Sequence, residues 1–301
     1  MNAPRTRVQR RPVHGLLLLD KPLGMSSNNA LQKAKYLLRA EKAGHTGTLD
    51  PLASGVLPLC FGAATKFSQI HLDADKAYEA VAKMGQTTST ADAEGEVLTQ
   101  REATFTPADL AQVALTLSGP IQQTPPMHSA LKKDGKALYE YAREGLTVER
   151  VPRSITIRSL RLEEIEPQDG LRCVRMWVDC SKGTYIRTLA EDMGAALHCG
   201  AHLISLRRTR SGPFGEADCV TLEQLEAMDE DQRQALLRPV DSLLQGHHPI
   251  TLAPHDSGRF LSGLRRRGAW PDCEHVSVYG QDPHSLLGTA HVKAGELIPT
   301  R

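Results

Sequence analysis

The sequence contains little that would indicate a metal site, a disulfide framework or a membrane span. Its six cysteines include no C-x-x-C pair and are not accompanied by histidines at ligand spacing, which argues against a zinc ribbon and against a disulfide scaffold and favours reduced thiols. The one apolar run near the start, Leu16 to Leu19, is too short for a signal sequence or a transmembrane helix. We therefore expect a cytoplasmic protein with no metal site.

Net charge is also small, at +1, and its distribution is more informative than its sum. Residues 1–72 hold ten Lys and Arg against three Asp and Glu, whereas residues 213–256 hold two against nine. Such asymmetry can produce a basic surface that attracts a polyanion. On charge alone, however, solvated surface is the simpler interpretation of both segments.

Apolar periodicity and helix caps predict a chain of mixed α and β structure with a basic start. Residues 1–12 carry four arginines and no acid, a composition typical of a flexible arm. Ser26 or Ser27 can cap a first helix, and Thr106-Pro107 is a typical start for another. The remaining expected elements are strands at 14–20, 77–84, 154–166 and 171–180, a helix at 185–198, a strand from about 202, and acidic helices within 221–245.

Two parts of the chain differ from this main domain, which we place at residues 13–248. Residues 124–150 are polar and bear lysines, with a short helical pattern that stops at Gly145. They resemble an insertion that could move as a lid. After Pro249 the chain consists of short segments broken by Gly and Pro, which predicts a small β-rich domain over residues 249–301.

The segment from Gly44 to Pro58 displays one carboxylate, Asp50, and one imidazole, His45, on a loop with three glycines. Glycine allows a ligand to approach the backbone closely, and Pro51 biases Asp50 toward an extended or turn conformation. The segment lacks the patterns of a phosphate-binding P-loop and of a zinc-binding H-E-x-x-H helix. From the residues alone, Asp50 is interpreted equally well as a turn-capping residue.

A second candidate segment runs from Cys180 to Leu189, where a predicted strand passes through a tight turn at Gly183 into a helix. Tyr185 and Arg187 would lie in the first turn of that helix. A guanidinium placed near a carboxylate keeps it ionised, as a nucleophile requires. Taken alone, a surface arginine on a helix is the simpler interpretation of Arg187.

Three strings together resemble the motifs of the bacterial tRNA pseudouridine-55 synthases. They are GLLLLDKP and GMSS within residues 15–27, GHTGTLDP at 44–51 and SKGTYIR at 181–187, and the resemblance is continuous from about Gly15 to Arg210. It implies isomerisation of uridine 55 in the T-loop of tRNA to pseudouridine, by base flipping and covalent catalysis without a cofactor. The sequence departs from the family at His128, where members commonly have Tyr.

The resemblance also implies roles for individual residues. Asp50 would be the nucleophile, Arg187 would pair with it, and Tyr185 would border the pocket. Tyr78 would stack on the flipped base and is the candidate general base, while His45 would occupy the space that the base leaves. Leu206 would form an apolar pocket wall, and Lys21 and Pro22 would support the pocket. Without the resemblance, Tyr78 and Leu206 would be interpreted as ordinary core residues of strands.

The expected RNA-backbone contacts are basic residues of the insertion and of the strand near residue 202. They are Lys132, Lys133, Arg207 and Arg208, and a solvated charge is a close alternative for the two arginines. In the C-terminal domain, Arg265, Arg266 and Arg267 would form a basic patch.

The implied fold is α+β, with a curved, largely antiparallel mixed sheet, a helical insertion and a small C-terminal β-barrel of the PUA type. The implied partner is the T-arm of tRNA, and the chain would act as a monomer with no membrane and no obligate protein partner. One rival is an RNA-binding or tRNA-folding module with secondary catalysis. Another is a hydrolase that uses Asp50 and His45, against which the lack of a second nearby loop carboxylate argues.

Overall fold

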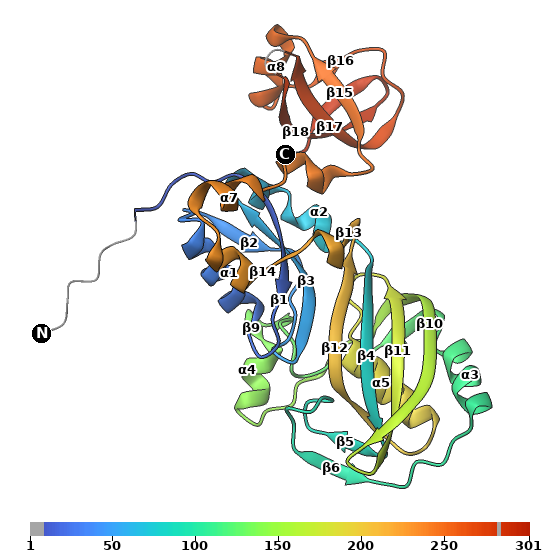
Figure 1. Cartoon of the computed structure of the whole chain (residues 1–301). Coiled ribbons are helices and arrows are strands. Elements are labelled where there is room, and N and C mark those ends of the chain that lie inside the picture. Colours follow the sequence, from blue (N-terminus) through green and yellow to red (C-terminus); the bar gives the residue numbers. More distant parts are fainter. Residues whose placement is uncertain (1–8, 282–283) are drawn as a thin grey trace, which may run out of the picture.

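The computed structural model describes residues 9–281 and 284–301 (Figure 1). Its main domain is built on a ten-stranded sheet with the strand order β14-β1-β3-β12-β4-β11-β10-β7, to which β13 and β2 are added beside β12 and β3. Only the pairs β1–β14 and β3–β12 are parallel. The strands are β1 (Gly15–Lys21), β2 (Ala43–His45), β3 (Ala53–Phe61), β4 (Lys76–Met84), β7 (Gly119–Gln123), β10 (Arg153–Gln168), β11 (Leu171–Cys180), β12 (Ala201–Ser211), β13 (Phe214–Gly215) and β14 (Val220–Thr221).

Helices and two small hairpins complete this domain. The hairpins pair β5 (Gln86–Thr88) with β6 (Val97–Gln100) and β8 (Lys132–Lys133) with β9 (Lys136–Ala137). The helices are α1 (Ser27–Leu37), α2 (Ser68–Leu72), α3 (Pro107–Thr116), α4 (Leu138–Arg143), α5 (Ile186–Ala196), α6 (Leu222–Ala227) and α7 (Glu230–Ala235), with the 3₁₀ turns η1 (Gly62–Lys66), η2 (Glu216–Asp218) and η3 (Val240–Leu244). The predicted α+β fold with a largely antiparallel sheet is therefore confirmed.

Local sequence signals account for several of these boundaries. Ser26 caps α1 by accepting a hydrogen bond from the backbone N–H of Asn29, and Thr106 and Asp109 form a capping box at the start of α3. The insertion predicted at 124–150 contains only the β8–β9 hairpin and the short helix α4. In the residues that the structure describes, no helix is long and apolar enough to cross a membrane.

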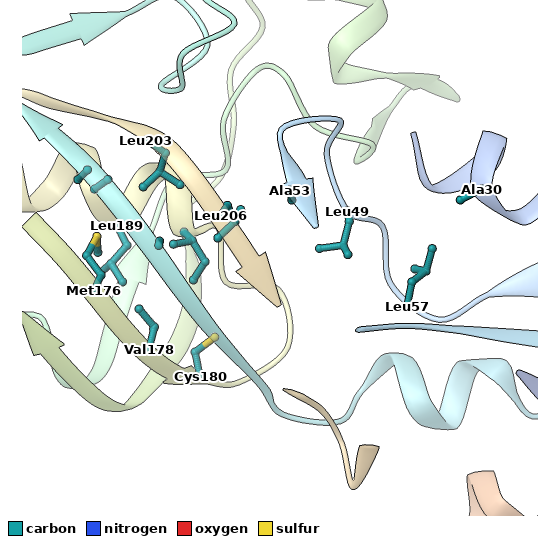
Figure 2. Packing of buried hydrophobic residues seen from close by; sticks show 14 of the residues in the cluster. Ala30, Leu49, Ala53, Leu57, Met176, Val178, Cys180, Leu189, Leu203 and Leu206 are labelled. Atoms are coloured by element: carbon teal, nitrogen blue, oxygen red, sulfur yellow. The ribbon is translucent and has the colours of Figure 1, made fainter. Parts of the chain in front are cut away.

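One face of the sheet carries the main hydrophobic core. Val174, Met176, Val178 and Cys180 alternate along β11 and are all buried, because successive strand residues point to opposite faces. Figure 2 shows Met176 and Val178 together with Leu189 of α5, which packs into the same core. The same core continues along β4 and β12, whose buried residues include Ala80, Ala82, Leu203 and Leu206.

The C-terminal domain has a sheet and a core of its own, set apart at one end of the molecule (Figure 1). Its strands are β15 (His248–Leu252), β16 (Arg266–Arg267), β17 (Cys273–Gln281), β18 (His284–Lys293) and β19 (Glu296–Pro299), with the helix α8 (Pro254–Leu261). Ile250, Phe260, Val276, Val278 and Leu297 are among the residues of its core. The β-rich segment predicted after Pro249 is thus present.

The basic arm predicted over residues 1–12 is described only at its end, because residues 1–8 lie outside the described part. Arg11 pairs through its backbone with Arg39 and Glu41, and its guanidinium lies 2.6 Å from the carboxylate of Glu230. Arg10 donates a hydrogen bond to the carbonyl of Ala40. This end of the predicted arm is therefore fixed to the main domain.

Candidate active site

Asp50 lies on the loop between β2 and β3, and the surrounding backbone holds that loop in place. The hydroxyl of Ser27 accepts from the backbone N–H of Leu49 at 2.7 Å and donates to its carbonyl at 2.9 Å. The carbonyl of Pro51 accepts from the N–H of Gly24. Gly55, at the start of β3, has φ +101°, and a side chain there would meet the backbone of Arg208. Residues on both sides of Asp50 are therefore fixed, which restricts the directions open to its carboxylate.

The pairing predicted between Arg187 and Asp50 is present. The Nε of Arg187 lies 3.0 Å from Oδ2 of Asp50, and the arginine side chain is only 5% exposed whereas that of Asp50 is 37% exposed. The other guanidinium nitrogens donate to the carbonyls of Thr90 at 3.0 Å and of His128 at 2.6 Å. A buried cation thus joins the loop that carries Asp50 to two other loops, while the carboxylate remains open on one side.

Asp92 is the main site residue that sequence reasoning missed. It is buried in the loop between β5 and β6, with its Oδ2 3.5 Å from Nη1 of Arg187. Its Oδ1 accepts from the hydroxyl of Thr90 and from the backbone N–H of Glu94. The available signal was the string TSTADAEG at residues 88–95, in which hydroxyl and acidic side chains favour a tight, self-bonded loop.

A second carboxylate therefore does lie near Asp50, contrary to the sequence-based argument against a hydrolase. It cannot serve as an acid or base for a substrate in this structure, however, because Asp92 is buried and its oxygens are bonded within the protein. Glu94, on the same loop, is exposed, and burial, Asp92 and Asp50 together raise its pKa. The predicted lack of a second carboxylate near Asp50 is therefore wrong and gives no argument against a hydrolase.

Burial and nearby cations act in opposite directions on Asp50. Burial raises the pKa of this carboxyl above its ordinary value, and Asp92 adds to that effect, whereas Arg187 and Lys21 lower it. Lys21 is itself buried and donates to the carbonyls of Pro22 and Met25. Burial lowers the pKa of Lys21 to about 8, and Asp50 opposes that shift. Lys21 thus holds the turn at Pro22 and adds positive charge beside Asp50, while its role in supporting the pocket stays a prediction.

Tyr78 and Leu206 occupy neighbouring strands at the same end of the sheet. Leu206 of β12 lies opposite Ala53, the first residue of β3, and opposite Ala80 of β4. Tyr78 lies opposite Arg208 in the same pair of strands. Burial raises the pKa of Tyr78, and Arg208 opposes the shift. The register places Leu206 directly beside β3, the strand that follows the Asp50 loop, and Tyr78 one strand further away.

His45 and Tyr185 border the same region from two different elements. His45 ends β2, five residues before Asp50, and its Nδ1 is buried without a hydrogen-bond partner among the described residues. Burial and the nearby Arg208 lower the pKa of His45, which keeps the imidazole neutral. Tyr185 directly precedes α5, and burial raises the pKa of its phenol. These residues supply aromatic surface without charge.

The four residues predicted to contact the RNA backbone have different surroundings in the structure. Lys132 is exposed, and Lys133 donates to the carbonyl of Glu149. Arg207 is paired with Asp20 and Glu216, so its charge is already neutralised. The prediction for Arg208 is wrong in this structure: the residue is 1% exposed and donates to the carbonyls of Val56 and Gly47, so it supports the Asp50 loop from within.

Two family models match consecutive parts of the main domain, and the boundary between them falls inside α5. Residues 35–186 match the N-terminal domain of the TruB family of pseudouridylate synthases, and residues 187–245 match the C-terminal domain of tRNA pseudouridylate synthase B. The second match ends before the small β-rich domain. Among the residues that the structure describes, no group of three or more His, Cys, Asp or Glu side chains could hold a metal ion.

Similar proteins cover nearly the whole chain. The tRNA pseudouridine synthase B of Verminephrobacter eiseniae is 61% identical over 303 aligned residues, covering 99% of this chain and 91% of that protein. The protein of the same name from Ralstonia nicotianae is 58% identical, covering 97% and 95%. A crystal structure of a Cbf5–Nop10–Gar1 complex contains a similar chain, with a TM-score of 0.72, 26% identity and coverage of 98% and 85%.

Proposed function

Because this chain belongs to the TruB family of pseudouridylate synthases, we propose that it isomerises uridine 55 in the T-loop of tRNA and that Asp50 is the covalent nucleophile. The observation that carries the proposal is the Asp50–Arg187 pair, in which a partly exposed carboxylate lies 3.0 Å from a buried guanidinium. Arg187 has its other donors fixed by main-chain carbonyls. It therefore holds the carboxylate in one orientation and stabilises its charged form.

The chemistry needs no redox partner. The C1′–N1 bond of the uridine breaks, the uracil turns, and its C5 joins C1′; the proton on C5 is released, and N1 gains one. A carboxylate can attack C1′ of the sugar or C6 of the uracil, or assist a glycal-like intermediate. All three routes place the base within reach of Asp50, which the loop between β2 and β3 presents beside the pocket.

Reaching C1′ or C6 requires the nucleotide to leave the stack, which costs a few kcal/mol. Tyr78 would offset this cost by stacking on the flipped base, and Leu206 would close the pocket with an apolar wall. Neutral His45 would fill the gap left in the T-loop. Burial of an uncharged imidazole in stacked RNA bases is favourable, whereas a charged one would lose hydration.

RNA recognition in this proposal is mostly by shape and backbone. Lys132 and Lys133 stand on the β8–β9 hairpin of the insertion, whose root contacts Arg187 through His128. We further propose that the chain works in the cytoplasm as a monomer, with tRNA as its partner, and that residues 249–301 add RNA contacts.

Mapping of the product tests the proposed position. An unmodified tRNA transcript is incubated with the protein and treated with a carbodiimide, which marks pseudouridine as a stop in primer extension. We expect one stop at position 55, and no stop in a transcript that carries cytidine there. A stop at another uridine in both transcripts would contradict the proposed specificity, and no stop in any folded tRNA would favour the rival RNA-binding role.

A further inference from the structure

A buried glutamine holds the turn from which Tyr185 and Arg187 project. Gln123 is the last residue of β7 and is 2% exposed. Its Oε1 accepts a hydrogen bond from the backbone N–H of Tyr185 at 2.7 Å, and its Nε2 donates to the backbone carbonyl of Tyr185 at 3.1 Å. One side-chain amide therefore pairs with both polar groups of a single backbone residue. This arrangement fixes the turn in position and in rotation.

The contact supplies what the start of α5 lacks. Tyr185 is the N-cap residue of this helix and makes no side-chain capping bond, although a Ser, Thr, Asp or Asn usually fixes a helix start. Arg187 is the second residue of α5, so any rotation of the first turn moves its guanidinium. That guanidinium lies 3.0 Å from Asp50. The amide of Gln123 thus controls the direction from which the cation meets the nucleophile.

A second contact comes from the same stretch of chain. His128, which follows Gln123 by five residues, accepts a hydrogen bond from Nη2 of Arg187 through its carbonyl at 2.6 Å. Residues 123–128 therefore hold the turn at 185–187 at two points, the backbone of Tyr185 and the side chain of Arg187. The same stretch leads from the sheet into the insertion, which makes it the structural link between the insertion and the pocket.

We propose that Gln123 is a positioning residue for the isomerisation, which aligns Tyr185 and Arg187 with Asp50 without touching the substrate. The proposal rests on the function proposed above. Because Gln123 is uncharged and buried, its loss leaves the surface that meets RNA unchanged and acts only through the turn. A misplacement of about 1 Å near a reacting group lowers a rate on the order of 10²-fold. Loss of Gln123 should therefore lower turnover and leave the affinity for RNA unchanged.

Two substitutions with matched controls test this role. Gln123→Met keeps the length of the side chain and removes both hydrogen bonds, and we expect kcat to fall by about 10- to 100-fold with KM for tRNA within about threefold. The controls are Gln122→Met and Gln122→Glu, because Gln122 is the exposed neighbour and bonds only to Ser154. These controls should match the wild type.

Gln123→Glu adds a second measurement, the pH dependence of kcat, which would stay like that of the wild type if Gln123 only stabilised the fold. The ionised carboxylate would point its second oxygen at the carbonyl of Tyr185, whereas the protonated acid would donate to it as the amide does. Burial raises the pKa of a carboxyl, so the ratio of its kcat to that of the wild type should rise as the pH is lowered from about 8 to about 5.5. A flat ratio, or wild-type kcat in both Gln123 variants, would overturn the proposal.

Hydrogen exchange of the peptide that spans residues 183–189, measured without RNA, separates this proposal from the proposed function. We expect faster exchange in Gln123→Met than in Gln122→Met. If the wild type formed no pseudouridine, the proposed function would fail, while faster exchange would still support Gln123 as the residue that holds the turn. Unchanged exchange, or a change in melting temperature or KM alone, would refute the positioning role.

Discussion

Replacing Arg187 by lysine keeps a positive charge but removes the hydrogen-bond geometry around Asp50. The guanidinium donates in three directions, through Nε to Asp50, through Nη1 to the carbonyl of Thr90 and through Nη2 to that of His128. A lysine ammonium carries all its donors on one nitrogen. It cannot reach all three acceptors from the same position, so at least one main-chain carbonyl loses its partner and Asp50 loses its fixed orientation.

The expected losses follow from burial. A carbonyl left without a partner in a fully buried site costs about 1–3 kcal/mol, and the carbonyls of Thr90 and His128 are partly buried. With one or two of them affected and water able to reach them in part, the free energy of unfolding should fall by about 1–3 kcal/mol. The rate of the chemical step should fall on the order of 10²-fold, since the nucleophile is no longer held in its reactive position.

Urea titrations measure the first loss, and single-turnover tritium release from a transcript labelled at uridine C5 measures the second. Filter binding should show tRNA affinity close to that of the wild type, because Arg187 is buried and does not form part of the surface that meets RNA. Arg161→Lys is the control: Arg161 is exposed and its pair with Glu163 lies at the surface, where such pairs contribute little. A single-turnover rate within threefold of the wild type for Arg187→Lys would mean that the chemical step does not depend on the guanidinium geometry at Asp50.

Other residues provide smaller tests. Burial lowers the pKa of Lys21 to about 8, below the ordinary value of about 10.4 in an unfolded chain. Between these two pH values the unfolded chain binds more protons than the folded one, so the free energy of unfolding rises with pH in that range. Urea titrations at pH 7.5 and 9.5 should show that rise in the wild type and not in Lys21→Met. The same change in the free energy of unfolding with pH in both proteins would exclude a strongly lowered pKa of Lys21. Tyr78→Phe keeps the stacking face, so tRNA affinity should stay within about threefold while turnover falls, whereas Tyr78→Leu should weaken affinity too; normal turnover of Tyr78→Phe would exclude the phenol as the base. Arg267 is 88% exposed and lies 3.4 Å from the carboxylate of Glu296, a surface pair that contributes little and that a phosphate can replace. Arg267→Gln should reduce the slope of log affinity against log salt by about 1, and an unaltered slope would mean that this arginine does not contact phosphate.

Local signals in the sequence were sufficient for most of the secondary structure. Caps at Ser26 and Thr106 and the alternation along 171–180 predict the observed elements closely, because each depends on residues near one another in the chain. The pairing of Arg187 with Asp50 is different, since 137 positions separate them in the sequence. Only the family resemblance placed them together, and nothing in either local pattern specifies the contact.

Residues that act through buried contacts were the ones that sequence reasoning missed or misassigned. Arg208 was predicted to contact RNA, yet strand alternation places it on the same face as Leu206, two positions earlier, and therefore inside the protein. Arg207, between them, lies on the other face and is neutralised by Asp20 and Glu216. Asp92 and Gln123 have polar side chains of ordinary appearance in the sequence, and their roles depend on partners that only the folded sheet brings near.

Tritium release by Asp50→Asn is the measurement that decides whether the carboxylate of Asp50 is the nucleophile. Asparagine keeps the shape of the side chain and a hydrogen-bond acceptor for Arg187 but is not a carboxylate nucleophile. We expect release from a uridine-C5-labelled tRNA by the wild type, none above background by Asp50→Asn, and tRNA affinities within about threefold of each other. Sustained release by Asp50→Asn, mapped to the same uridine, would contradict the assignment of Asp50 as the nucleophile.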